Sequence, residues 1–269
     1  MRNGAADPRH WANFAMYAPL LDHPVIAPLA AAILGAIFGS FIGALVVRWP
    51  AGRSILTGRS QCDACGAQLK PWQLIPLISY ILLRGRCAAC GTAIGWHCFA
   101  IELSAALIGA LSLAVHPGAE GLAIAAFGWL LLPLALLDLR HYWLPHPLNA
   151  ALALGALAGA ALDIPPDWTS RLIGAGAGCG GLWLIALLYR LTRGREGLGG
   201  GDPLLLGAIG LWLGWQALPL VLLIASGLGL AVALVLQRRG HDLDAATRFP
   251  LGTLMALAAW PVALAGLSG

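Results

Sequence analysis

The chain has 269 residues, of which 59% are hydrophobic and only 10% are charged, and its mean hydropathy is +0.79. Soluble domains carry about 25% charged residues, so this composition excludes an ordinary soluble domain and predicts an all-α polytopic membrane protein. The formal net charge is +4. Its distribution along the chain reflects membrane topology rather than nucleic-acid binding, so no nucleic-acid partner is expected.

The apolar segments predict about eight transmembrane helices. A hydrocarbon core of about 30 Å requires roughly 20 apolar residues per helix, and fewer where neighbouring helices shield the segment. The predicted spans are residues 25–47, 98–115, 121–138, 147–162, 170–191, 202–215, 217–237 and 250–267. The fourth and sixth spans are short.

The basic residues predict the orientation of these spans. Of the sixteen Lys and Arg residues, thirteen lie in segments that follow odd-numbered spans: Arg48, Arg53, Arg59, Lys70, Arg84, Arg86, Arg140, Arg190, Arg193, Arg195, Arg238, Arg239 and Arg248. The positive-inside rule places these segments in the cytoplasm. Residues 1–24 are then a non-cytoplasmic tail. The three exceptions to this distribution are Arg2, Arg9 and Arg171.

Residues 48–97, between the first two spans, are predicted to form a small cytoplasmic subdomain. They contain CDACG (Cys62, Cys65) and CAACG (Cys87, Cys90), with 21 residues between the pairs. Paired CxxC motifs at this spacing are typical of a zinc site, with two disulfides or a redox pair as alternatives. Because the cytoplasm keeps thiols reduced, we expect a structural zinc site that folds a segment too small to bury its own core.

Two aspartates are predicted at the cytoplasmic ends of spans. Asp138 ends the third span in LALLDLRHYWLP, and Asp202 begins the sixth in GLGGGDPLLL. Carboxylates within spans usually face a cavity or a partner, and two at one depth suit the activation of a water molecule. Simpler interpretations are an ion pair with Arg140 and a helix cap ahead of Pro203. A phosphate loop is disfavoured because no Lys-Ser/Thr pair follows GLGGGD.

The helix dipoles suggest how the two aspartates divide their roles. Asp138 lies at the C-terminal end of its predicted helix, where negative charge is disfavoured, and Asp202 lies at an N-terminus, where it is favoured. The sequence-based hypothesis is therefore that Asp202 is the base and Asp138 the acid.

Five segments, in order along nearly the whole chain, resemble those of the type IV prepilin leader peptidases, which are GxGD-type aspartic membrane proteases. They are GSFIGALVVRWP (39–50), LIPLISYILLRGRC (74–87), DLRHYWLP (138–145), GGGD (199–202) and FPLGTLMALAAW (249–260). Five matches in order are far more specific than any one of them.

The resemblance implies a multi-pass enzyme of the bacterial inner membrane in which residues 98–269 form a seven-helix peptidase domain. Such enzymes cleave the basic leader peptide from type IV prepilins or type II secretion pseudopilins at the cytoplasmic face. Many members then methylate the new N-terminus with S-adenosylmethionine. By the same resemblance, Asp138 and Asp202 are the catalytic pair and the four cysteines of the two CxxC motifs are the zinc ligands. Glu102 resembles a family glutamate, for which methyl transfer, substrate contact and an interfacial structural role all remain open.

The chain departs from the family pattern at several positions. Gly43 stands where the family usually has asparagine, at a position tied to methylation. His146 replaces an aspartate, Leu204 replaces a common lysine, and Thr253 stands where proline is usual. None of these changes removes a predicted catalytic aspartate.

Two other functions would use the same aspartates. A transporter could relay protons or cations through Asp138 and Asp202, and an inactive scaffold could serve pilus or secretion assembly. The transporter leaves the cysteine insert and the five ordered matches without an explanation. The sequence does not indicate an oligomeric state.

Overall fold

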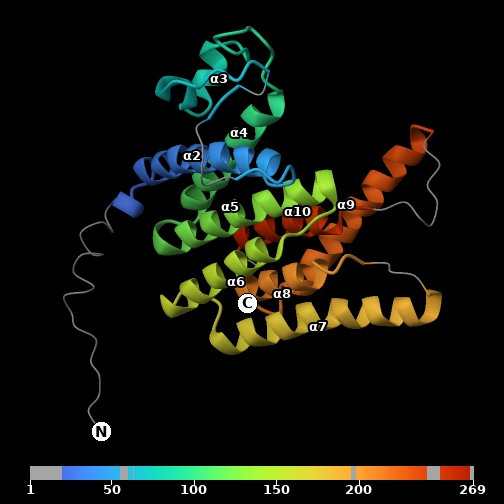
Figure 1. The fold of residues 1–269 in the computed structure, drawn as a ribbon. Helices are drawn as coiled ribbons and strands as arrows, with labels where there is room; N and C mark the ends of the chain where they lie inside the picture. The colour runs from blue at the N-terminus through green and yellow to red at the C-terminus, as the bar shows by residue number, and fades with distance from the viewer. Residues whose placement is uncertain (1–19, 55–59, 63, 195–197, 241–248, 267–269) are drawn as a thin grey trace.

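Eight long helices make up most of the protein, for which a computed structural model describes residues 20–54, 60–62, 64–194, 198–240 and 249–266 (Figure 1). The helices are α2 (Ile26–Arg48), α4 (Trp96–Val115), α5 (Gly118–His141), α6 (His146–Ala161), α7 (Trp168–Arg193), α8 (Asp202–Leu213), α9 (Leu218–Arg238) and α10 (Leu251–Leu264). Within the described ranges there is no strand, only two isolated β-bridges. Most of the predicted N-terminal tail, residues 1–19, lies outside the described residues.

Each of the eight predicted spans coincides with one of these helices, and the all-α polytopic prediction is confirmed. In the described part of the chain, five helices are long and apolar enough to cross a membrane by length and composition: α2, α4, α5, α7 and α9. The other three are shorter. At 1.5 Å per residue, the 12 residues of α8 extend only about 18 Å, which is less than the hydrocarbon thickness.

Glycines allow two helix pairs to pack closely, as is common where small residues line membrane helix contacts. In the α2–α4 pair, a Cβ on Gly35 would collide with the Ala105 backbone. That carbonyl also accepts a hydrogen bond of 2.8 Å from Trp129 Nε1, which ties α5 to the same pair. In the α7–α8 pair, a Cβ on either Gly174 or Gly210 would collide with the backbone of the other glycine.

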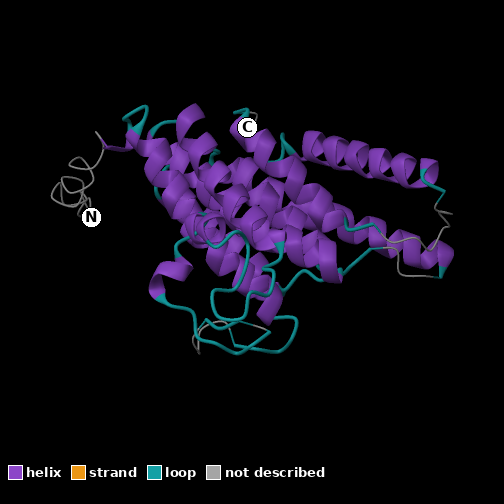
Figure 2. Ribbon diagram, turned by 90° about the horizontal axis from the view of Figure 1, so that it is seen from above, coloured by secondary structure: helices purple, strands orange, loops and turns teal. Residues whose placement is uncertain are grey.

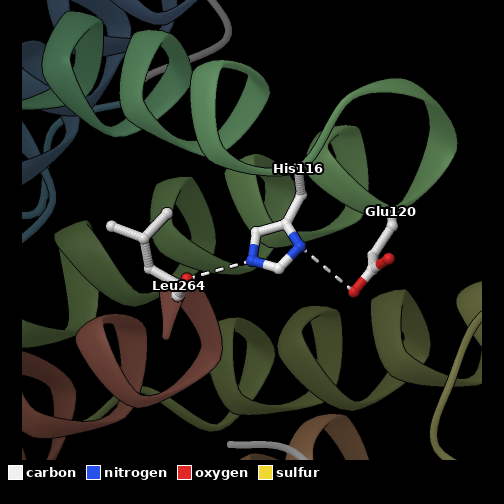
Figure 3. Close-up of polar contacts among 3 residues, drawn as sticks. All are labelled: His116, Glu120 and Leu264. Carbon is white, nitrogen blue, oxygen red and sulfur yellow. Dashed lines mark hydrogen bonds and ion pairs between the residues drawn. The ribbon is translucent and has the colours of Figure 1, made fainter. Parts of the chain in front are cut away.

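Helix α10 lies between α5 and α9, and α7 lies at the edge of the bundle opposite the cysteine insert (Figure 1). The end of α10 is tied to the α4–α5 junction by His116, whose Nε2 is 2.9 Å from the Leu264 carbonyl oxygen (Figure 3). The other ring nitrogen, Nδ1, is 3.4 Å from Glu120 Oε1. These contacts fix the end of α10 that is remote from Asp138.

Arg171 is an exception to the positive-inside distribution, and the structure explains why it is tolerated. Its side chain is 1% exposed, and its guanidinium donates hydrogen bonds to five backbone carbonyl oxygens, those of Ala156, Ile164, Pro165, Pro166 and Leu211. It therefore joins the α6–α7 connection to the C-terminal end of α8. This buried cation serves packing rather than membrane orientation.

The insert between α2 and α4 contains the 3-10 helix η1 (Pro71–Leu74) and the short helix α3 (Ile78–Leu82). Figure 2 shows its loops extending to one side of the helical bundle. Most of its side chains are exposed or half-buried, and of the insert's described residues only Cys87 and Gly85 are buried. The insert therefore lacks an apolar core of its own, as its size and polarity predicted.

Candidate active site and metal centre

The two predicted aspartates lie on different helices and are both buried. Asp138 is in the last turn of α5 and is 5% exposed, while Asp202 is the first residue of α8 and is 6% exposed. Helix α5 ends beyond Asp138 because Tyr142 adopts the left-handed conformation, and its N–H donates to the Asp138 carbonyl oxygen at 2.9 Å. Helix α8 begins at Asp202 with Pro203 in its first turn, a position where proline is favoured.

The structure brings the two carboxyl groups together. Asp202 is close enough to Asp138 for the two carboxylates to repel each other electrostatically. Leu144, which is buried, packs at this junction, since a Cβ on Gly201 would lie 2.6 Å from its Cβ and a Cβ on Gly252 would lie 2.9 Å from its Cδ1. The pair is therefore formed by α5, the loop before α8 and the start of α10.

The helix cap considered for Asp202 is not formed. The N-cap of α8 is Gly201 and has no side-chain hydrogen bond. The Asp202 carboxylate points back to the glycine run, where its Oδ2 accepts a hydrogen bond of 3.0 Å from the Gly199 N–H. The glycine loop thus supplies one backbone donor to this carboxylate.

Asp138 has two donors, both from Thr253 of α10. The Thr253 N–H donates to Asp138 Oδ2 at 2.7 Å, and Thr253 Oγ1 lies 3.2 Å from the same oxygen. The same hydroxyl, which has a single proton to donate, also lies 2.9 Å from the Ala135 carbonyl oxygen. The ion pair considered with Arg140 is replaced by these contacts. In the sequence, Thr253 stands out only as a departure from the proline that the family usually has, and nothing in the local sequence links it to a residue 115 positions away.

The four cysteines of the insert form a compact cluster. Their Sγ atoms all lie within 4.8 Å of one another, and Cys62 Sγ is 3.9 Å from Cys90 Sγ. Four thiolates around zinc, each at about 2.3 Å in a tetrahedron, lie about 3.8 Å apart, so the arrangement fits the metal. All the cysteines are free, which contradicts the two-disulfide alternative.

The two CxxC motifs adopt the same knuckle. The glycine N–H after each motif donates to the carbonyl of its first cysteine at 2.9 Å, from Gly66 to Cys62 and from Gly91 to Cys87. Both glycines have positive φ, of 71° and 72°, a conformation that side chains disfavour. A side-chain hydrogen bond with Thr92, together with one to the Thr92 backbone, lowers the pKa of Cys90 to about 6, which favours the metal-binding thiolate.

Glu102 joins the insert to the membrane helices. It lies on α4, and its Oε2 accepts a hydrogen bond of 2.7 Å from the Leu77 N–H. Leu77 has a φ of 60°, so this hydrogen bond holds an unfavourable backbone conformation at the start of α3. A Cβ on Gly39 would lie 2.6 Å from the Glu102 Cα, so only glycine at this position allows α2 to approach α4 this closely.

A cavity of about 380 Å³ lies between the insert, the C-terminal half of α2 and the first turns of α4. Glu102 lines it together with Ser40, Tyr80, His97 and Thr92. Its volume is in the range of small-molecule and cofactor sites. Gly43 lies one helical turn from both Ser40 and Val47, two residues that line the cavity, and a Cβ on it would meet nothing within 4 Å.

The cavity and the aspartate pair lie at the same end of the bundle. Trp49, at the end of α2, makes an edge-to-face contact with Trp143, in the α5–α6 loop, with ring centroids 5.6 Å apart. Arg140, two residues after Asp138, is within electrostatic range of His97 of the cavity. Two candidate sites therefore face the same side of the membrane helices.

Two family models match the chain. Residues 33–116 match the model described as the bacterial peptidase A24 N-terminal domain, and residues 125–234 match that of the type IV leader peptidase family. No solved structure matches the chain.

Three curated relatives bear the name prepilin leader peptidase/N-methyltransferase. The protein from Burkholderia pseudomallei (strain K96243) is 38% identical over 265 residues, covering 88% of this chain and 85% of its own. The protein from Pseudomonas aeruginosa PAO1 is 33% identical, and the match covers 92% of this chain and 95% of the relative. The protein from Aeromonas hydrophila is 36% identical, and the match covers 79% of this chain and 73% of the relative. The chain belongs to the type IV leader peptidase family.

Proposed function

We propose that this protein is an aspartic endopeptidase of the bacterial inner membrane that removes the basic leader peptide from type IV prepilins or type II secretion pseudopilins. Asp138 and Asp202 are its catalytic pair. The observation that carries this proposal is the convergence of two buried carboxylates from different helices, beside a glycine loop, in a chain of the leader peptidase family. The distribution of basic residues supports a cytoplasmic location for this site.

The pair can hydrolyse a peptide bond if one carboxyl is ionised and the other is protonated. The ionised carboxylate takes a proton from water as the water oxygen attacks the scissile carbonyl carbon, and the other carboxyl gives its proton to the carbonyl oxygen. When the C–N bond breaks, the first carboxyl passes its proton to the leaving nitrogen. One proton of the gem-diol returns to the second carboxyl, so both groups regain their starting states.

The cysteine cluster is proposed to hold structural zinc through Cys62, Cys65, Cys87 and Cys90. Zinc would supply the folding free energy that the insert lacks, since its described residues bury almost no apolar surface. A closed site of four thiolates leaves no coordination position for substrate, so we assign it no catalytic step.

The cavity beside Glu102 is proposed to bind S-adenosylmethionine for methylation of the new N-terminus. The names of the relatives include this second activity, and the cavity has the size of a cofactor site and a largely apolar lining with a few polar side chains, among them Glu102 and His97. The cofactor supplies a methyl group when bound. Glu102 contributes a carboxyl group to its lining, and Gly43 leaves open the space where the family usually has asparagine.

The experiment that tests the function is incubation of purified protein, in detergent, with a prepilin-like peptide. Wild type should cleave the peptide after the basic leader, and Asp202→Ala should not. Addition of S-adenosylmethionine should then yield an N-methylated product. Absence of cleavage by wild type with bound zinc and a native melting temperature would instead favour the scaffold or transporter functions.

A further inference from the structure

We propose that Thr253 is a positioning residue that holds Asp138 as the ionised, proton-accepting member of the pair and leaves Asp202 as the proton-donating member. This inference rests on the proposed function, in which the two aspartates are the catalytic pair. It assigns a role in the reaction to Thr253, which lies on α10 and not on the helix of either aspartate.

The backbone N–H of Thr253 can donate to Asp138 in either protonation state of that carboxyl. Its N–H lies in the first turn of α10, where backbone N–H groups have no partner within the helix, and it points at Asp138 Oδ2 from 2.7 Å. An N–H can only donate, so the oxygen that it faces must accept. Hydrogen bonds donated to a carboxylate favour its ionised form.

The hydroxyl of Thr253 can serve both protonation states of Asp138. Oγ1 lies 3.2 Å from Asp138 Oδ2 and 2.9 Å from the Ala135 carbonyl oxygen, and a hydroxyl carries one proton and two lone pairs. While Asp138 is ionised, the hydroxyl proton points to its Oδ2. Once Asp138 has taken the proton from water on its other oxygen, Oδ1, Oδ2 still accepts from the Thr253 N–H and the hydroxyl proton can turn to the Ala135 carbonyl oxygen. Thr253 therefore supports the base before and after proton transfer.

Asp202 lacks an equivalent set of donors. Its Oδ2 accepts from the Gly199 N–H alone among the described hydrogen bonds, and its carboxyl lies near that of Asp138. Two like charges at close range cannot both be favoured, so the shared proton resides on the carboxyl with fewer donors. Asp202 has fewer hydrogen-bond donors than Asp138, so the shared proton resides on Asp202.

The groups around Asp138 support this distribution of charge. From α8 it faces Asp202, and from α10 it faces only uncharged groups, the backbone and hydroxyl of Thr253 and the backbone of Gly252. On its own helix, Arg140 and His141 are exposed in the last turn. From α4, His97 interacts with Arg140.

The test compares three substitutions at one position by the pH dependence of kcat/KM for leader cleavage. Thr253→Ser keeps both donors, Thr253→Val keeps the shape and the N–H but loses the hydroxyl, and Thr253→Pro loses both. Proline is tolerated here because this N–H makes no bond within α10. We expect a wild-type profile for Thr253→Ser. The acid limb should move to higher pH by about half to one unit for Thr253→Val and by about two units for Thr253→Pro, with KM unchanged.

An acid limb that stays in place in both Thr253→Val and Thr253→Pro, or a shift of the alkaline limb instead, would overturn the inference. If Thr253→Pro fails to fold, the comparison of valine with serine decides alone. The proposed function fails separately, namely if Asp138→Asn or Asp202→Asn retains cleavage, whatever the Thr253 series shows.

Discussion

At the scale of single residues, the proposed roles of the two aspartates follow the hydrogen bonds to their carboxyl groups rather than the dipoles of their own helices. A dipole contributes about 0.3–1 kcal/mol at a helix end. A hydrogen bond to a charged group contributes about 1.5–3 kcal/mol, and the ionised Asp138 can accept from both the N–H and the hydroxyl of Thr253, whereas Asp202 accepts from one N–H. In addition, Asp138 lies at the C-terminal end of its own helix but at the N-terminal end of α10. The dipole of α10 therefore favours negative charge on Asp138 and offsets the opposite effect of the α5 dipole.

The glycine run before Asp202 contains one position where a side chain has no room. A Cβ on Gly201 would lie 2.6 Å from Leu144 Cβ, whereas a Cβ on Gly200 would meet nothing within 4 Å. We predict that Gly201→Ala displaces the loop or Leu144 and lowers the rate of leader cleavage by about 10- to 100-fold, because small displacements of catalytic groups are costly. Gly200→Ala, the matched control, should retain the wild-type rate. Equal rates for the two variants would show that this packing does not position Asp202.

At the scale of elements, Glu102 connects the insert to the membrane helices. Glu102→Gln keeps a side-chain oxygen that can accept from the Leu77 N–H, whereas Glu102→Ala removes it. We predict that Glu102→Ala makes the insert more sensitive to limited proteolysis and that Glu102→Gln does not. Methyl transfer should fall in both variants if the charge serves the cofactor. An insert that resists proteolysis as well in Glu102→Ala as in wild type would show that this hydrogen bond does not dock it.

The insert and the aspartate pair are built from separate elements, so loss of zinc should affect them differently. No described insert residue donates to the carboxyl group of Asp138 or Asp202. We predict that a chelator exposes residues 60–93 to proteolysis while peptide cleavage stays within about threefold of the untreated rate. Cys90→Ser should behave like chelated protein, and Cys179→Ser, outside the cluster, like wild type. Loss of cleavage together with loss of zinc would contradict this separation.

At the scale of the whole molecule, the sequence predicted the features that depend on local sequence pattern, namely the helices and the cysteine cluster. All eight apolar segments are helices, and the two CxxCG motifs form a four-sulfur cluster, because hydrophobic length and cysteine spacing act over short distances in the chain. The contacts of Thr253 with Asp138 and of Glu102 with Leu77 join residues 115 and 25 positions apart. They arise from helix packing, which no local pattern encodes.

The central claim is that Asp138 and Asp202 together hydrolyse the leader peptide bond. The most direct test is the kcat/KM for cleavage of a prepilin-like peptide by Asp138→Asn and Asp202→Asn, with the exposed Asp163→Asn as control. Asparagine keeps the size of the side chain but can act neither as the base nor as the acid. We expect a loss of about 1,000-fold or more in the Asp138 and Asp202 variants and none in the control. Cleavage near the wild-type rate by either active-site variant would contradict it.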